Sequence, residues 1–492
     1  MNRSPSAALR ALAVWAGPVL FITVAARVFA GAPNAPLLLL AALVAPLAAL
    51  LQSPTEDDDP APVTAIVLCG SAAVLLWANV LAIGDAAAAL GVDRWRGVAV
   101  AGACALIVAL WRPLAARAVG AAVIGIILAI AAVGGLGMVT GIAPWAAWRE
   151  TSAQLALDFT DGSVWVNEGR ALGEASTLTF AESHRVTAES AATWRVTERE
   201  GGETTTREWK LSPGDALTLR PGDRLALDAH ARVRFETGKR VPGALASGVA
   251  WADPDRGIAA AVHFVGTVLT LIGGALVLLR PRRRLSRVGA VGAPASLVIA
   301  LLVAGAAGIY AAHAGAELGL GASARAPFLR APALLLSPPA SVALTATAAG
   351  GLLALFVGTA AALRERVVAA VAAADPPRLL RLHPDLLWIA MLGVVICASV
   401  RPADAWHVML AGCGLAACAW TAGPAENYGE RAVAVGVACG ATLFVALTLA
   451  RPMLPWGVAA LAAYPALVAV PFAHVIAAAA GAVFGTAARS YR

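Results

Sequence analysis

The sequence predicts an all-α polytopic membrane bundle of about twelve transmembrane helices, with one small all-β domain inserted on the extracytoplasmic side. Three observations favour this fold class. Hydrophobic residue types make up 59% of the 492 residues and charged types only 14%, whereas roughly a quarter of a soluble globular protein is charged. Apolar runs long enough to cross a bilayer recur along the chain. The remaining charge is concentrated in one central segment.

The charge distribution divides the chain into three predicted domains. Residues 142–257 contain 14 basic and 17 acidic residues, whereas the other 376 residues contain 23 and 13. The central segment therefore has the charge density of a soluble domain, and the two flanking regions have that of a membrane protein. We expect an N-terminal membrane region of five helices over 1–141, the soluble domain over 142–257, and a C-terminal membrane region of about seven helices over 258–492.

Twelve apolar segments are candidate membrane spans because each is close to the length that a helix needs to cross the hydrocarbon core. The fourth and ninth are short, and the run 331–338 before the eighth is typical of a re-entrant or interfacial piece. The predicted spans are 9–30, 35–52, 62–83, 97–111, 118–141, 258–279, 289–313, 340–363, 386–400, 405–422, 431–450 and 455–486.

The distribution of arginine predicts the orientation. With the N-terminus inside, the inner side of the twelve spans carries 16 arginines, and the outer side without residues 142–257 carries 7. Basic residues are in excess on the cytoplasmic side of membrane proteins. The chain is therefore predicted to lie in the inner (cytoplasmic) membrane with both termini cytoplasmic and residues 142–257 outside, in the periplasm.

The pattern within 152–241 predicts short β-strands. Apolar and polar side chains alternate in pieces such as Val233-Arg234-Phe235-Glu236, which is the period of a half-buried strand. The tripeptide Pro-Gly-Asp occurs at residues 213–215 and again at 221–223. Proline fixes the first corner of a turn and glycine supplies positive φ, so each copy predicts a tight turn in a small β-sandwich or barrel.

Ionisable residues inside predicted spans are the candidate functional residues, since placing them in a membrane is costly. Histidine titrates near neutral pH and is the commonest metal ligand, so a cluster of His263, His313 and His407 at the outer ends of their spans would suit a proton-linked, metal or haem site. The alternative is that each histidine packs near the headgroups. Asp404 and His407 form the firmest predicted pair, because a spacing of three residues places them on one helix face. The ligand or proton-linked candidates are His263, His313, His407, Asp404 and His474.

Further residues extend this candidate list. Glu317 and Arg401 lie at predicted span ends on the same outer side. His474 lies in a last span that contains Pro465 and Pro471, so this helix is expected to be broken twice by proline. An Arg-Pro-x-x-x-Trp motif occurs at 401–406 and at 451–456, which indicates either a duplicated two-helix unit or shared interface chemistry.

Several chemistries are excluded by residue usage. Both lysines lie in 142–257, so no membrane segment can carry a lysine Schiff base. The six cysteines lie in apolar spans without a C-x-x-C pair, which gives no case for zinc or an iron–sulfur cluster. No basic run is interleaved with aromatic residues, so nucleic acid is not an expected partner. The expected surroundings are the lipid bilayer and partner membrane or periplasmic subunits.

One local segment resembles a known family. His383-Pro384-Asp385-Leu386-Leu387-Trp388, with Gly393 further on, resembles the His-Pro-x-Leu-Leu-aromatic segment of the cytochrome c haem-lyase family. In that family the histidine is an external haem ligand beside a tryptophan-rich loop, so the resemblance implies haem handling. The match covers about a dozen residues, the tryptophan-rich motif is absent, and the arginine distribution places His383 on the cytoplasmic side.

Two function classes follow from these observations. The first is a transport or translocation component with an outward-facing β domain, favoured by the helix number and the spans interrupted by proline and glycine. The second is a non-transporting assembly or accessory subunit of an envelope or respiratory complex, with haem handling in cytochrome c maturation as its most concrete form. An enzyme is the third interpretation, but no nucleophile–base motif supports it.

Overall fold

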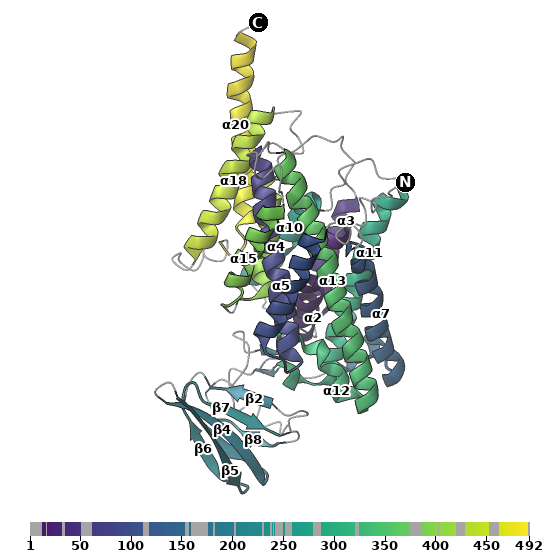
Figure 1. The fold of residues 1–492 in the computed structure, drawn as a ribbon, viewed down its shortest axis with the longest axis vertical. Coiled ribbons are helices and arrows are strands. Elements are labelled where there is room, and N and C mark those ends of the chain that lie inside the picture. Colours follow the sequence, from purple (N-terminus) through teal and green to yellow (C-terminus); the bar gives the residue numbers. More distant parts are fainter. Residues whose placement is uncertain are drawn as a thin grey trace.

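The computed structural model describes most of the chain. The residues that it describes are 12–15, 17–31, 35–50, 62–111, 118–152, 157–158, 176–180, 183–200, 203–228, 231–236, 239, 241, 249–250, 258–278, 287–319, 324–373, 385–401, 403–419, 429–451 and 462–490. The fold is mostly helical, with all described strands between residues 157 and 250. The strands form a β region at one end of an elongated helical bundle (Figure 1).

Seven helices in the described part of the chain are long and apolar enough to cross a membrane. A helix needs about 20 apolar residues to cross the hydrocarbon core of a bilayer. Seven helices of this kind are compatible with an integral membrane protein. The seven are α4 (Pro62–Ala89), α7 (Ala121–Thr140), α10 (Ile258–Leu278), α11 (Arg287–Ala314), α13 (Pro338–Ala373), α18 (Glu430–Ala450) and α20 (Ala466–Ser490).

Shorter helices occupy the remaining predicted spans. They are α2 (Pro18–Ala30), α3 (Ala35–Leu50), α5 (Arg94–Leu110), α15 (Asp385–Ala398) and α16 (Ala405–Cys418). Each of the twelve predicted segments therefore contains a helix. Seven of these helices have the length and composition of a membrane span, and crossing by the other five stays a prediction.

The last predicted span differs from expectation. We expected 455–486 to be a helix broken twice by proline, but α20 begins at Ala466, directly after Pro465. Only Pro471 lies inside this helix. The physical reason is that proline is compatible with the start of a helix, where its missing N–H has no intrahelical partner to lose. The part of the segment at 455–461 lies outside the described residues.

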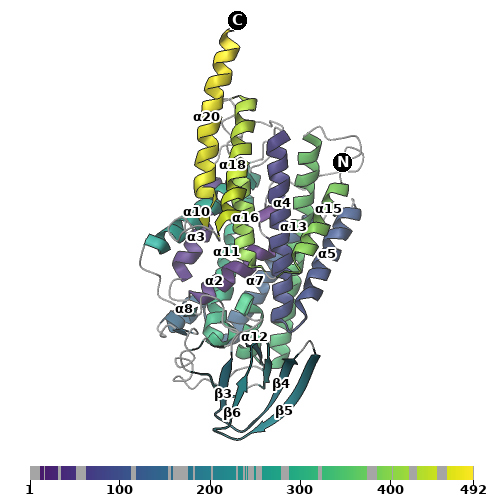
Figure 2. The ribbon, with the colours of Figure 1, turned by 90° about the vertical axis from the view of Figure 1, so that its left-hand side faces the viewer.

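Helix α4 lies at the centre of the bundle. It contacts α5, α13, α16, α2, α15 and α18, and the two views show it surrounded by these helices (Figures 1 and 2). Close approach depends on small residues. A Cβ on Gly97 of α5 would lie 2.8 Å from the carbonyl oxygen of Ile83, and one on Gly125 of α7 would lie 2.8 Å from that of Gly351. Small residues at such crossings let helix backbones approach in a membrane.

The strands form three antiparallel sheets. A two-stranded sheet pairs β1 (Leu157–Asp158) with β9 (Val249–Ala250). The four-stranded sheet has the order β2 (Ser176–Thr179), β7 (Arg224–Leu227), β4 (Ala192–Glu200) and β5 (Glu203–Leu211). The three-stranded sheet has the order β6 (Ala216–Leu219), β3 (His184–Ala188) and β8 (Val233–Arg234).

The expected strand pattern and turns are present in this β region. Alternate residues are buried, including Trp194 and Val196 of β4, and Gly214 and Gly222 have φ of 94° and 95°. In both Pro-Gly-Asp turns the aspartate Oδ2 accepts a 2.7 Å hydrogen bond from a backbone N–H three residues earlier. The two copies therefore have the same turn chemistry, an aspartate closing a turn whose glycine has positive φ.

Short helical elements lie where the β region meets the bundle. Helix α8 (Pro144–Ser152) follows α7 and packs against α11. The elements η2 (Ala316–Gly319), η4 (Pro327–Leu329) and α12 (Ala331–Leu335) lie between α11 and α13. Element η4 is buried and contacts α2, α4, α11 and α13. The views place α12 at the end of the bundle nearer the strands (Figures 1 and 2).

Candidate functional site

Asp404 is the N-cap of α16 and pairs with His407. Its Oδ1 accepts a 2.9 Å hydrogen bond from the backbone N–H of Trp406, and its Oδ2 lies 2.9 Å from Nδ1 of His407. Aspartate is a preferred N-cap because its carboxylate satisfies a free N–H of the first turn. The structure thus brings together the pair that the spacing predicted, with Asp404 just before the helix.

Arg27 of α2 joins this pair from another part of the sequence. Its Nη2 lies 3.7 Å from Oδ2 of Asp404, and its Cζ lies 5.6 Å from the centroid of the Trp406 ring. The side chains of Arg27, Asp404 and His407 are about half exposed, at 46%, 52% and 52%. A guanidinium at this distance from an indole face makes a cation–π contact.

His263 belongs to a second group of polar contacts. Its Nδ1 lies 3.3 Å from the hydroxyl oxygen of Tyr464, to which Thr267 donates a 3.1 Å hydrogen bond. Tyr464 precedes α20, and its ring lies against Gly266 of α10, where a Cβ would be 2.4 Å from the ring carbon Cγ. Because Gly266 has no side chain, the ring of Tyr464 can pack against α10, where its hydroxyl contacts His263.

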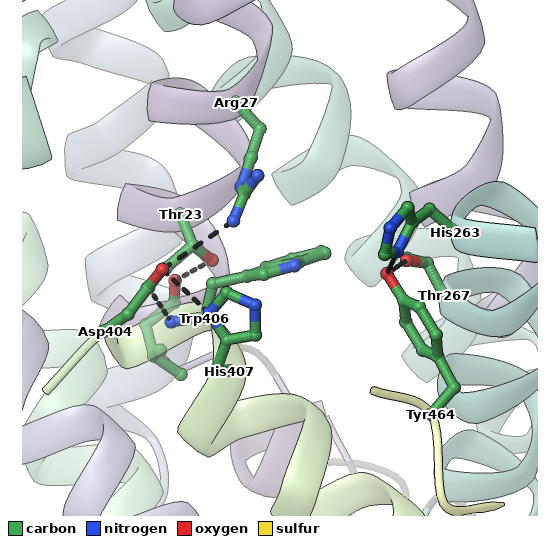
Figure 3. A network of polar contacts seen from close by, with 9 residues as sticks. Thr23, Arg27, His263, Thr267, Asp404, Trp406, His407 and Tyr464 are labelled. Carbon is green, nitrogen blue, oxygen red and sulfur yellow. Dashed lines mark hydrogen bonds and ion pairs between the residues drawn. The ribbon is translucent and has the colours of Figure 1, made fainter. Parts of the chain in front are cut away.

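The two groups face one another. The Trp406 ring extends from α16 toward His263, with Arg27 and Asp404 at its other end (Figure 3). We call this set the polar cluster. Its members are Arg27, Asp404, Trp406, His407, His263, Thr267 and Tyr464.

The polar cluster lies inward from the end of α4 that is nearer the strands. Ser71 of α4 donates to the carbonyl of Gly412 in α16, and Val67 of α4 is in the same apolar cluster as Ala419. The two helices therefore run antiparallel. At about 1.5 Å per residue the start of α16 lies beside about residue 80 of α4, roughly 14 Å short of the end of α4. Figure 2 shows α16 ending above the lower end of α4.

The remaining predicted site residues have other partners. His313 lies at the end of α11, where its Nδ1 is 3.2 Å from Oε2 of Glu150 on α8. His474 places its Nδ1 3.0 Å from the carbonyl oxygen of Val470 in its own helix. Arg401 is exposed, and the side chain of Glu317 lies outside the described residues. Of the four membrane histidines, His263 and His407 belong to the polar cluster.

A buried carboxylate that the sequence analysis missed lies near the end of α4. Asp85 is 5% exposed, and its Oδ1 lies 2.9 Å from Nε of Arg94 and 3.1 Å from Nη1 of Arg325. Arg94 begins α5, and Arg325 lies in the segment before η4. The sequence contains a signal for this residue, because an acidic side chain among the apolar residues of 80–89 is costly in a membrane unless it is paired. Its two partners could not be read from spacing.

The segment that resembles the haem-lyase family begins α15. Asp385 pairs with Arg364 of α13, and the fully buried Trp388 donates its indole N–H to the carbonyl of Ala105, 3.4 Å away. These two residues dock α15 against α13 and α5. His383, which the resemblance implies as a haem ligand, lies outside the described residues.

The polar cluster combines groups that bind ions or move protons. It holds one carboxylate, one guanidinium, two imidazoles, a phenol, an alcohol hydroxyl and an indole, all on or beside apolar helices. Among the residues that the structure describes, no group of three or more His, Cys, Asp or Glu side chains could hold a metal ion. No protein-family model matches the chain, and no curated protein matches it either.

Proposed function

We propose that this chain is a transport or translocation component of the inner membrane, with the β region outside and the polar cluster in the path of the substrate. The observation that carries the proposal is the cluster itself. Arg27, Asp404 and His407 are half exposed although they lie beside apolar helices and inward from the end of α4. Ionisable residues in such a place line a water-filled cavity or an ion path in membrane proteins.

The pairing of Asp404 with His407 supports proton-linked transport. Histidine is the side chain whose charge changes most readily near neutral pH, and Nδ1 of His407 lies 2.9 Å from the carboxylate of Asp404. A second histidine, His263, bonds to the hydroxyl of Tyr464 on the other side of Trp406. In this proposal the two titratable groups on either side of the aromatic ring form the gate for a proton and a substrate.

Reconstitution tests this proposal. The purified chain is placed in lipid vesicles that contain a pH-sensitive dye, and an inward proton gradient is imposed. We expect faster acidification than in protein-free vesicles, and we expect His407→Ala and His263→Ala to slow it more than His184→Ala in the β region. Size-exclusion profiles check that each variant is folded. Acidification no faster than in empty vesicles would contradict proton-linked transport.

The alternative of a non-transporting accessory subunit, with or without haem, makes different predictions. An accessory subunit would copurify with partner subunits in fixed proportion and would give no flux. Haem handling would give an absorbance band in the Soret region after purification. Neither observation is expected for the transport component proposed above.

A further inference from the structure

We propose that the polar cluster recognises an organic cation, such as a guanidinium or substituted ammonium group, and that Arg27 occupies this site as an internal cation. The inference rests on the proposed function in taking the polar cluster as the substrate site. It adds the chemical class of the substrate and a role for Arg27.

The surroundings of Arg27 are those that proteins use to bind organic cations. Its guanidinium has a carboxylate, that of Asp404, at 3.7 Å and an indole face, that of Trp406, at 5.6 Å from the ring centroid. A cation over an aromatic face is attracted by the negative potential of the ring, and quaternary ammonium ligands are recognised in this way. The carboxylate adds the charge that selects a cation.

Arg27 is held loosely enough to be displaced. Its contact of 3.7 Å with Asp404 is longer than a hydrogen bond between nitrogen and oxygen, which is about 2.7–3.2 Å. Its side chain is 46% exposed and it lies in the last turn of α2. Long, exposed arginine side chains gain little from a single ion pair of this kind. A cation from solution can therefore compete with it.

Asp404, in contrast, stays in place when Arg27 leaves. One of its oxygens accepts from the backbone N–H of Trp406, and the other bonds to His407. The carboxylate is thus held at the helix start, by the backbone of the residue that carries the indole. The recognition surface is pre-organised, which lowers the cost of binding.

Charge balance favours a cation over an anion. Asp404 and Arg27 neutralise one another, and a cation that displaces the Arg27 side chain takes its place beside the carboxylate. An anion would instead meet the carboxylate of Asp404. The other members on the far side of Trp406 are Tyr464, Thr267 and His263, whose oxygen and nitrogen atoms can accept hydrogen bonds from the N–H groups of a guanidinium.

Binding to the purified full-length chain in detergent tests the inference, with guanidinium and tetramethylammonium as probes in calorimetric titrations. We expect Arg27→Gln to raise the affinity for both probes about tenfold, because the internal competitor is removed. Asp404→Asn should lower the affinity at least about tenfold, while keeping the helix cap. Trp406→Leu should weaken binding, and Trp406→Phe should restore part of it.

The chain offers a matched control in Asp93, which caps α5. Its Oδ1 accepts a 3.1 Å hydrogen bond from the backbone N–H of Trp95, as Asp404 does from Trp406. Asp93→Asn should therefore leave the affinity unchanged. Equal or weaker binding to Arg27→Gln than to the wild type would overturn the inference, as would Arg27-dependent binding of acetate or sulfate. Absence of binding to both proteins would also overturn it.

The binding test separates this inference from the proposed function. Cation binding without proton flux in vesicles would contradict transport and leave the recognition site intact. Proton flux without binding of either probe would contradict the organic cation and leave proton-linked transport in place.

Discussion

His407 lies 2.9 Å from Oδ2 of Asp404 through its Nδ1, while Oδ1 of the same carboxylate caps α16. One aspartate therefore has two separable roles, in starting a helix and in holding an imidazole. If Nδ1 donates to the carboxylate, Nε2 is left as the proton acceptor of the ring. The two roles can be separated by substitution, because asparagine is as good a cap as aspartate but has no charge.

We expect Asp404→Ala to destabilise the protein by about 1 kcal/mol through loss of the cap, and Asp404→Asn to change stability little. Both variants should lose proton flux in vesicles, since neither keeps a charged partner for His407. Thermal unfolding of the purified protein measures the first effect. Asp93→Ala controls for it, because this residue caps α5 in the same way and should reduce stability without reducing flux. Equal destabilisation by Asp404→Asn and Asp404→Ala would contradict the separation of roles.

Substitution of the buried Asp85 is expected to reduce stability more than substitution of Asp404. Asp85→Asn leaves the guanidiniums of Arg94 and Arg325 without the charge that they share, and breaking a buried ion pair costs about 3 kcal/mol or more. Arg325→Gln should be much milder, because Arg325 is 41% exposed and Arg94 still neutralises Asp85. The two unfolding temperatures, measured in the same detergent, check this ranking. A loss for Arg325→Gln as large as that for Asp85→Asn would show that Arg94 alone cannot balance the carboxylate.

Gly266 is expected to be essential for the position of Tyr464. A methyl group there would lie 2.4 Å from Cγ of the tyrosine, so Gly266→Ala must displace the ring from His263 and Thr267. Overpacking of this kind costs about 1–3 kcal/mol, and we expect flux to fall as well. Gly134→Ala in α7 is the matched control, because a Cβ there meets nothing within 4 Å. Similar unfolding temperatures for the two alanine variants would argue against the packing role of Gly266.

The sequence predicted those features that depend on local geometry. The lengths of the apolar runs predicted a helix in each of twelve segments, and the Pro-Gly-Asp repeats predicted two turns. A spacing of three residues predicted that His407 lies beside Asp404. Contacts between elements were not predictable in this way. Arg27 reaches Asp404 from the other end of the chain, because the packing of α2 against α16 brings them together. The same holds for Tyr464 with His263 and for Asp85 with Arg325.

The candidate residues His313 and His474 show the same limit from the opposite direction. Both were candidates because a histidine in an apolar span is costly. His313 instead pairs with Glu150 on α8, and His474 bonds to its own helix. A histidine can satisfy its polar atoms locally or with a neighbouring element, and composition alone does not distinguish these cases.

Glu236 is expected to make the stability of the β region depend on pH. Hydrogen bonds from the side chain of Lys239 and from the backbone N–H of Arg185 lower the pKa of this carboxyl below its ordinary value of 4.5. Its contribution to stability is therefore present above pH 4.5 and is lost as the pH falls through the lowered pKa of the folded state. We expect faster hydrogen exchange in β3 and β8 at acid pH, after correction for intrinsic rates. Glu236→Gln should show the faster exchange at neutral pH also, and a Glu236→Gln protein as protected as the wild type would contradict this role.

The arginine distribution predicts the orientation of the chain in the membrane. The predicted inner side carries 16 arginines and the outer side 7, which places the β region outside and the segment between α10 and α11 inside. Reporter fusions after residue 200, in the hairpin between β4 and β5, and after residue 285 should therefore report opposite sides of the membrane. A phosphatase that is active only outside should be active at 200 and inactive at 285, and a fluorescent protein at the C-terminus should be bright because that end is predicted to be inside. The same side for residues 200 and 285 would require an even number of crossings between them, which α10 as a single span between the two sites does not allow.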